Sequence, residues 1–424
     1  DWREVQSREK TIHNPLLRPI PLNPTNGISP DAAAILAVLI NPSLRAERDR
    51  RGVAAAQLLQ AGILPNPQTS GNVDFVTGGT LTPGLVTGYG LSVSWDIQAL
   101  IERGAKRAAA SAQARSVALD VAWTEWQTAE SAKLAVYQVA ADEAELASAK
   151  DVDDRLAHNL SVIKKAVAAH IKTAVDLATA ESASQTAHST VLGLQQSLSE
   201  DWVALKRALG VPPQTAIRLA PNIEFPTRVG TPSLAELQRG LETPRLDLLG
   251  LRRGYESQEA NVRAAILGQF PKISLGFNQA SDTSNVHTMG PSVTIGLPVF
   301  DRNQGAIAVE RATRQRLFDE YINRVFEARS DIAKALADIQ SLNNQVAAAE
   351  AAVPVLERLV ETYRIALNEH SVDAYSYYSA QNNLDQEKIQ LLKLKQQLVQ
   401  NNVALELAAG RYLPLPNSAT SQSL

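Results

Sequence analysis

The sequence predicts a mixed α/β fold in which very long helices dominate and four strands form two hairpins. Residues 99–210 and 302–411 are rich in Ala, Leu, Gln, Glu, Arg and Lys and nearly free of Gly and Pro, which is typical of long helices. Short stretches of alternating polar and apolar residues precede both regions. The same order of features occurs twice, about 200 residues apart, which indicates duplication of a whole architectural unit.

The duplication is visible in matched positions of the two halves. The matches are Pro42 and Pro244, Leu44 and Leu246, Arg51-Gly52 and Arg253-Gly254, Pro67 and Pro271, Gly104 and Gly305, and Gly210 and Gly410. We therefore predict a first repeat at 29–210 and a second at 233–414. Residues 211–232 form the linker, 1–28 an extended proline-rich arm, and 415–424 a C-terminal tail.

Each repeat is expected to begin with two short helices. Ser29-Pro30 supplies a hydroxyl N-cap followed by proline at the first helical position. That helix runs to about Ile40, and Pro42 restarts a second one that ends near Leu64. In the second repeat Ser233 caps a short helix and a longer helix restarts at Pro244.

Strand hairpins follow at about 70–97 and 272–299. The alternating segments are 72–76, 91–95, 273–277 and 293–297, joined by loops at 77–88 and 279–291. Strict alternation gives each strand one apolar and one polar face. Strands of about ten residues are long enough to cross a bilayer when tilted, although a soluble β-sandwich fits the alternation as well.

The long helices favour the membrane-spanning interpretation of the strands. Residues 99–169 make a helix of roughly 105 Å at 1.5 Å per residue, and residues 173–209 return beside it. The second repeat has the same pair at 302–369 and 373–410. Such a shaft has no single compact core, so it needs neighbours side by side, and the sequence predicts an oligomer.

Composition excludes several classes of protein. The net charge of −3 gives no sign of nucleic-acid binding, and the absence of cysteine excludes disulfides and thiolate metal sites. The longest apolar run, 32–40, is too short for a membrane-spanning helix, and a start at Asp1 suggests a processed or engineered N-terminus. No nucleophile elbow, phosphate loop or metal-binding motif is present, so we predict no enzyme, no catalytic residues, no cofactor and no resident metal.

One segment resembles a known family. Leu297-Pro298-Val299-Phe300-Asp301-Arg302-Asn303-Gln304-Gly305 is similar to the strand-to-helix junction of TolC-like outer-membrane efflux factors. Within this family, the segment most resembles the heavy-metal (CzcC/CusC-like) branch. Members of that branch work in tripartite resistance-nodulation-division (RND) pumps. Residues 103–107 resemble the same junction in degraded form.

The resemblance implies a homotrimer in the outer membrane of a Gram-negative bacterium. Each chain would give four strands to a twelve-stranded transmembrane β-barrel in the outer-membrane lipid, and its helices to an α-helical barrel through the periplasm. The channel would export cargo passively, with divalent heavy-metal cations as the expected cargo. A periplasmic adaptor (membrane fusion protein) and an inner-membrane RND pump would be its partners.

Alternative functions stay open at this stage. A duct for drug efflux or for type I protein secretion fits the same architecture, because a wide tunnel need not recognise its cargo. A structural coiled-coil protein of the cell envelope would not need paired strands at matched positions. An enzyme is disfavoured because no catalytic constellation is present.

In the resembled family the helical hairpins turn at periplasmic tips, where the tunnel narrows and the adaptor docks. The tips fall at residues 169–172 and 369–372. The candidate pore and tip residues are His170, His370, Lys172, Asp176, Asp373 and Tyr375.

Each type of tip residue has a structural and a functional interpretation. Histidine tolerates the positive φ of a tight turn, but a trimer would also present six imidazoles that change charge between pH 5 and 8 or briefly hold a transition metal. Asp176 and Asp373 complement the helix macrodipole or form an acidic ring that attracts cations. Tyr375 packs against neighbours or narrows the tunnel.

Overall fold

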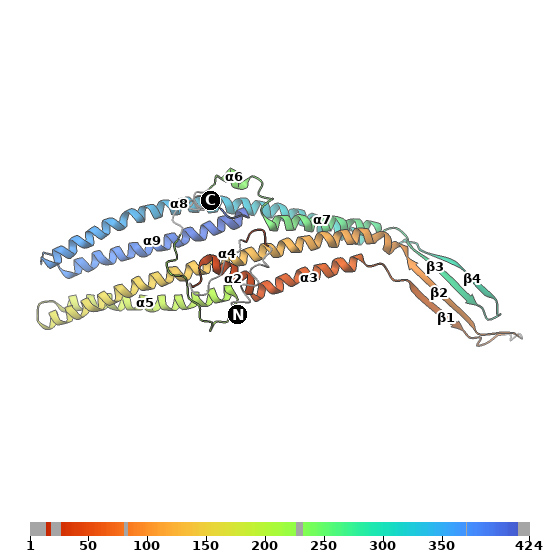
Figure 1. The fold of residues 1–424 in the computed structure, drawn as a ribbon, viewed down its shortest axis with the longest axis horizontal. Helices are drawn as coiled ribbons and strands as arrows, with labels where there is room; N and C mark the ends of the chain where they lie inside the picture. The colour runs from red at the N-terminus through yellow and green to blue at the C-terminus, as the bar shows by residue number, and fades with distance from the viewer. Residues whose placement is uncertain (1–13, 18–26, 80–83, 226–231, 370, 414–424) are drawn as a thin grey trace, which may run out of the picture. The chain divides into compact units, whose positions relative to one another are not determined.

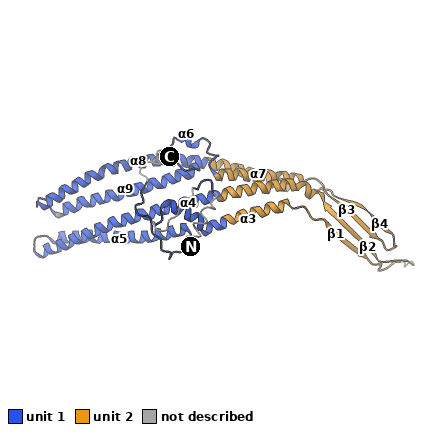
Figure 2. Cartoon of the chain, in the orientation of Figure 1, with its two compact units in different colours: residues 1–47, 122–245, 326–424 blue, residues 48–121, 246–325 orange. Residues whose placement is uncertain are grey.

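The computed structural model describes residues 14–17, 27–79, 84–225, 232–369 and 371–413. The chain divides into two compact units, shown in Figure 2. Unit 1 comprises residues 1–47, 122–245 and 326–424, and unit 2 comprises residues 48–121 and 246–325. Helices α3, α4 and α8 contribute residues to both units, so each unit is described by itself.

The elements follow the predicted order (Figure 1). The first half contains α2 (Pro30–Ile40), α3 (Pro42–Gly62), β1 (Gln68–Asp74), β2 (Gly88–Asp96), α4 (Ile97–Ala168) and α5 (Ala174–Leu209). The second half contains α6 (Leu234–Gln238), α7 (Leu246–Leu267), β3 (Lys272–Ser281), β4 (His287–Gly296), α8 (Gln304–Asn368) and α9 (Ala374–Ala409). The predicted fold class of very long helices with four strands is confirmed. The repeat boundaries at 29–210 and 233–414 stay a prediction, and residues 1–13, 18–26 and 414–424 of the predicted arm and tail lie outside the described residues.

Unit 2 contains one antiparallel sheet in the order β1-β2-β3-β4. The predicted strand bounds need correction at two places. β1 begins at Gln68 and ends at Asp74 because it pairs with Ser94 through Gly88 of β2. All its residues are exposed, so side-chain alternation gave little signal of where it starts. β3 and β4 pair as far as Ser281 and His287, which leaves a turn at 282–286 in place of the long loop expected at 279–291.

The turn between β3 and β4 is closed by a carboxylate. Asp282 Oδ1 accepts hydrogen bonds from the backbone N–H groups of Ser284 (2.8 Å) and Val286 (3.0 Å). Aspartate makes such local turns because its short side chain reaches the backbone two residues on.

In unit 1, α8 and α9 pack as a coiled coil. The buried residues of α8 are Ala328, Ile332, Ala335, Ile339, Leu342, Val346 and Ala349. Their alternating spacing of four and three residues is the heptad seam of two supercoiled helices. Leu394, Leu398 and Leu405 of α9 complete this core, with Leu237 of α6 beside them.

The first hairpin of unit 1 is packed in a similar way, with α2 as an additional layer. Ile35 and Leu36 of α2 share a buried cluster with Val136 of α4 and with Leu205 and Leu209 of α5. Full burial of each large aliphatic side chain contributes about 1.5–3 kcal/mol before the entropy of ordering is counted. This cluster therefore fixes the short helix against the long pair.

The helices α5 and α9 end at equivalent glycines. Gly210 and Gly410 adopt φ of 75° and 71°, the left-handed conformation that closes a helix. A Cβ on Gly210 would lie 2.5 Å from Asn41 Cα, and a Cβ on Gly410 would lie 2.5 Å from Arg245 Cγ. Asn41 and Arg245 each donate a side-chain hydrogen bond to the last turn of the facing helix, at the carbonyls of residues 208 and 408.

Candidate functional site

The sheet has one polar and one apolar face, as the alternation predicts. The register places Ser70 opposite Ser92, and Ser92 opposite Asn278, so these side chains share a face. The Ser70 and Ser92 hydroxyls are hydrogen-bonded at 2.8 Å. The other face exposes Tyr89, Leu91, Val93, Trp95, Leu275, Phe277, Val293 and Ile295. A strand with this pattern faces lipid on one side and water on the other.

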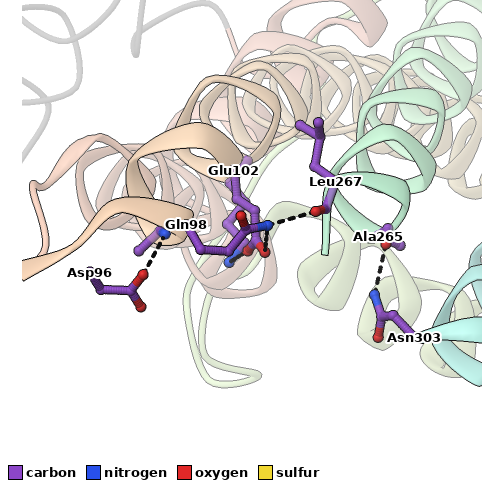
Figure 3. Close-up of polar contacts among 8 residues, drawn as sticks. Asp96, Gln98, Glu102, Ala265, Leu267 and Asn303 are labelled. Carbon is purple, nitrogen blue, oxygen red and sulfur yellow. Dashed lines mark hydrogen bonds and ion pairs between the residues drawn. The ribbon is translucent and has the colours of Figure 1, made fainter. Parts of the chain in front are cut away.

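At the junction of the sheet with the helices, side chains hold the C-terminal end of α7 (Figure 3). Gln98 Nε2 donates to the Leu267 carbonyl at 2.6 Å and to Glu102 Oε1 at 3.2 Å. Asn303 Nδ2 donates to the Ala265 carbonyl at 2.7 Å. The last carbonyls of a helix have no partner inside it, so Gln98 in the first turn of α4 and Asn303, the residue before α8, supply the missing donors.

Side chains also satisfy backbone groups where β2 leads into α4. Asp96 Oδ1 accepts a hydrogen bond from the Ala99 N–H at 3.1 Å, which caps the start of α4 (Figure 3). Arg103 donates from Nε (2.9 Å) and Nη2 (2.5 Å) to the Gly62 carbonyl at the end of α3. Arg103 belongs to the degraded junction motif, and its role in the structure is to cap the C-terminal end of α3.

The segment Leu297–Gly305, which carries the family resemblance, folds as a turn that opens α8. Asp301 Oδ1 accepts from the Asn303 N–H at 2.8 Å, and Gln304 Oε1 accepts from the Arg302 N–H at 2.7 Å. Asn303 has φ of 58°, a conformation that asparagine adopts more readily than most residues. Side chains of the motif therefore accept hydrogen bonds from its own backbone N–H groups and fix the turn that precedes α8.

The first hairpin tip turns between α4 and α5. His170 has φ of 58°, as the turn interpretation of this histidine requires. Thr173 and Asp176 form a capping box: Asp176 Oδ2 accepts from the Thr173 N–H (2.8 Å) and hydroxyl (2.9 Å), and the Asp176 N–H donates to Thr173 Oγ1 (3.2 Å). These hydrogen bonds, with the nearby Lys172, lower the pKa of the exposed Asp176.

The second tip turns between α8 and α9. Asp373 is the N-cap of α9, and its Oδ1 accepts from the Ser376 N–H at 2.9 Å. Hydrogen bonds from the hydroxyl and N–H of Ser376 lower the pKa of Asp373. Tyr375 is 66% exposed. His370 lies outside the described residues.

A groove of about 760 Å³ brings four of the predicted tip residues together. Lys172, Asp176, Asp373 and Tyr375 line it. Asp176 is influenced by both Lys172 and Asp373, so the two tips share one electrostatic environment within unit 1. The groove therefore has two carboxylates and one lysine side chain on its wall.

Sequence inspection missed the ion pair that crosses this groove. Arg155 of α4 pairs with Asp385 of α9, and Asp385 also lines the groove. Burial raises the pKa of Asp385, and the Arg155 guanidinium opposes that shift. Nothing in the sequence links residues 230 positions apart.

A buried cluster of charges that joins α4 to α2 and α9 was also missed. Glu130 is fully buried, beside Lys133 of α4 and Tyr412. Burial raises the pKa of Glu406 to about 7, although Lys133 and the Leu413 N–H at 2.9 Å oppose the shift. Burial alone would lower the pKa of Lys133, but the carboxylates of Glu130, Asp31 and Glu406 raise it above its ordinary value.

The described residues hold neither a metal-binding cluster nor a membrane-spanning helix. Groups of three or more His, Cys, Asp or Glu side chains arranged to hold a metal ion do not occur among them. Of the helices in the same ranges, none combines the length and apolar character needed to cross a membrane.

Comparison with known proteins shows which proteins this chain is similar to. Residues 241–411 match the outer membrane efflux protein family. The fold matches the Campylobacter jejuni CmeC outer membrane channel with a TM-score of 0.75 at 14% identity, over 93% of this chain and 89% of that one. Residues 241–411 thus resemble outer membrane efflux proteins, and the chain has the fold of their channels. The sequence prediction of this class, and of a Gram-negative outer-membrane location, is confirmed.

The sequence relatives of this chain include proteins of a cation efflux system. The chain is 27% identical over 191 residues to the cation efflux system protein CusC of Escherichia coli strain CFT073. That match covers 43% of this chain and 40% of CusC, so it spans less than half of either protein. A solved structure of CusC matches with a TM-score of 0.68 at 19% identity, over 94% of this chain and 97% of that one. At such identity the structural likeness shows a shared fold.

Proposed function

We propose that this protein is the outer-membrane duct of a tripartite export system, and that three copies of the chain form it. The observation that carries the proposal is the two-faced, open sheet at the end of very long helices. In the described part of the chain, β1 and β4 are the edge strands of the sheet, and each has a hydrogen-bonded neighbouring strand on one side only. Such edges are exposed templates for further pairing, and four strands are too few to close a barrel. Three copies of the chain supply twelve strands.

A second surface also favours assembly. Phe318, Ile322 and Phe326 lie at four-residue spacing on α8, and Phe326 is 68% exposed. Residues at this spacing share one face of a helix, and an exposed aromatic stripe marks a protein interface. We propose that this stripe of α8 packs against a neighbouring copy.

We propose divalent heavy-metal cations as cargo. Two observations support this choice: the sequence relatives named CusC belong to a cation efflux system, and hydrogen bonds lower the pKa values of both tip carboxylates. Acidic groups at a constriction attract cations and repel anions. The chain itself performs no chemical step; a periplasmic adaptor and an inner-membrane pump supply cargo and energy.

The trimer is tested by cross-linking the strand edges. The chain has no cysteine, so Ser70→Cys in β1 and Ser292→Cys in β4 place one thiol on each edge of the sheet. The double variant, treated in detergent with a short bismaleimide, is expected to form covalent dimers and trimers because β1 of one copy adjoins β4 of the next. The single variant Ser70→Cys is the control. A double variant that stays at the mass of one chain would contradict the closed barrel.

The cargo class is tested by ion selectivity in planar bilayers. Asp373→Ser removes the charge but retains an N-cap hydroxyl, and Asp176→Asn removes the second charge. We expect the double variant to lose most of the cation preference, measured as the reversal potential across a salt gradient. Asp338→Asn, an exposed carboxylate on α8 away from the groove, is the matched control. An unchanged reversal potential would remove the tip carboxylates from the proposal.

A further inference from the structure

An aspartate occupies a position of the first helical hairpin where the second has leucine. Asp142 of α4 lies between Val139 and Leu146, which are buried in apolar clusters that include residues of α5. The equivalent residue of the second repeat, Leu342, lies in the apolar core between α8 and α9. An ionised carboxylate at such a position costs free energy unless a partner replaces the water that it loses.

The side chain of Gln138 joins Asp142 to Asp201 of α5. Its Nε2 donates to both carboxylate oxygens of Asp142, at 3.2 and 3.3 Å, and to Asp201 Oδ2 at 3.3 Å. Its Oε1 accepts a hydrogen bond from Gln396 Nε2 of α9, which fixes the orientation of the amide. Because one NH₂ group reaches oxygens of both acids, the two carboxyl groups lie side by side.

The charged groups around Asp142 add to the repulsion. Asp201 and Glu145 have the largest electrostatic influence on it, and both are acidic. Lys393 of α9 lies 2.9 Å from Glu145, so that carboxylate offsets its charge. Two adjacent carboxylates repel each other when both are ionised, and the pair therefore keeps one proton to higher pH than a single acid does.

The titration of Asp142 agrees with this geometry. Burial and the hydrogen bond with Asp201 raise the pKa of Asp142 from its ordinary value of 3.8 to about 7, and the donation from Gln138 opposes this shift. Because the folded pKa lies above the unfolded one, the proton stabilises the folded contact at low pH. This contribution is lost as the pH rises from about 3.8 to about 7.

We infer that Asp142 and Asp201 share one proton, and that this proton stabilises the contact of α5 with α4. With the proton bound, one carboxyl donates to the other, and Gln138 donates to both. When the proton leaves, two negative charges face each other across the helix pair and the contact weakens. The second hairpin has Leu342 and Asn401 at these positions, so we expect the two hairpins to respond differently to pH.

Infrared spectroscopy tests whether the proton is shared, because a protonated carboxyl has a C=O stretching band that an ionised carboxylate lacks. Difference spectra are taken in detergent between about pH 6 and about pH 9, with Glu406→Gln in every sample to remove another carboxyl of raised pKa. We expect Asp142→Asn and Asp201→Asn each to lose the same component of this band, since either substitution removes a partner in the sharing. Glu143→Gln, which changes an exposed acid next to Asp142, is the control and should retain that component.

The two single variants separate sharing from simple burial. A component that persists in Asp201→Asn but not in Asp142→Asn would show that Asp142 holds the proton alone. Its persistence in both variants would show that neither acid is protonated. Either result overturns the shared proton.

Amide hydrogen exchange tests whether the proton stabilises the contact. Protection of residues 138–146 and 198–205 is compared between about pH 5 and about pH 8, after correction for the intrinsic exchange rate. If opening releases the shared proton, protection falls by up to about tenfold per pH unit as the pH approaches 7, and then levels off. Residues 338–346 and 398–405 of the second hairpin are the internal control and should show a smaller change.

The double variant Asp142→Asn with Asp201→Asn completes the test. Its first hairpin should lose the pH dependence, because two neutral side chains remain at these positions. A dependence equal to that of the unsubstituted protein, or an equal fall of protection in both hairpins, would overturn the role of the proton in this contact. Either failure would leave the proposed duct standing, because the strands and not this acid pair carry that proposal.

Discussion

The two long helices occupy equivalent places in the repeat, yet their side chains meet different surroundings. Trp126 of α4 is completely buried, whereas Phe326, 200 residues later on α8, is 68% exposed. Glu130 and Lys133 sit in a buried charge cluster, while their equivalents Ser330 and Ala333 are exposed. Each helix buries apolar residues against its own hairpin partner, but the outer faces of the two helices differ.

The difference arises from what covers each helix within the chain. α4 is covered near this point by Asn14, which donates to the Ala122 carbonyl at 2.9 Å, and by Tyr412, whose ring lies 5.8 Å from that of Trp126. The equivalent stretch of α8 keeps its aromatic side chain at the surface. The outer face of α4 at this point is thus covered within the chain, whereas that of α8 is exposed.

The largest effect is expected from a substitution that breaks the buried charge cluster of Glu130, Lys133 and Glu406. Lys133→Met leaves the carboxylates of Glu130 and Glu406 without the cation that faces them. We expect a loss of about 3 kcal/mol, because removing one member of a buried charged group strands the others. The guanidinium midpoint of unfolding in detergent, followed by tryptophan fluorescence at fixed protein concentration, measures it. Lys150→Met, an exposed lysine of α4, should change the midpoint little; equal effects would show that the cluster is not special.

The same cluster predicts a dependence of stability on pH. Glu406 has a raised pKa of about 7 against an ordinary value of 4.5, so the folded state binds more protons than the unfolded state between these pH values. Stability therefore falls as pH rises from about 4.5 to 7, by at most about 3 kcal/mol. Glu406→Gln should flatten this slope in unfolding midpoints taken across that range. An identical slope in Glu406→Gln would rule out this carboxyl, and Asp338→Asn serves as the unaffected control.

The glycines that end α5 and α9 allow a direct comparison of stability between the two halves. Gly210→Ala and Gly410→Ala each force alanine into the left-handed region at about 1–2 kcal/mol, and each adds an overlap. The neighbours of Gly210 are the backbone of Asn41 and the ring of Pro42, whereas Gly410 meets the side chain and backbone of Arg245. We expect Gly210→Ala to lower the unfolding midpoint more than Gly410→Ala does. The reverse order would mean that Pro42 yields more readily than Arg245.

The smallest expected effects concern the two tips. Thr173→Ala and Asp373→Ala each remove an N-cap and should cost about 1 kcal/mol of local helix stability. Amide hydrogen exchange in the first turns of α5 and α9 measures this loss separately for each tip. Asp373→Ser should retain the protection of α9, because a hydroxyl caps as well as a carboxylate. Loss of protection in Asp373→Ser would show that charge, not the cap, holds that turn.

Much of the fold follows from local signals in the sequence. Ser29-Pro30, Gly210 and Gly410 mark helix ends because few other residues suit an N-cap or a positive φ. The tips were placed correctly at 169–172 because the helical periodicity stops there. The alternation at 273–277 and 293–297 predicted which side chains share a face of the sheet.

The rest depends on partners distant in the sequence. β1 could not be bounded from its own residues, because its limits are set by pairing with β2. For Asp176 and Asp373 the sequence predicted only a charge that complements the helix macrodipole, and the hydrogen bonds by which they cap α5 and α9 were missed. Their roles in ion passage stay a prediction. Arg155 and Asp385, or Lys133 and Glu406, resemble any surface charges until the packing of α4 and α9 brings them together.

The two tips also suggest how the charge at such a rim evolves. Thr173 with Asp176, and Asp373 with Ser376, close the same kind of turn with the acid in swapped positions. A substitution that moves the acid from one position to the other passes through intermediates that still cap the helix. Mutational drift is therefore free to relocate negative charge around the rim while selection for a folded tip remains satisfied.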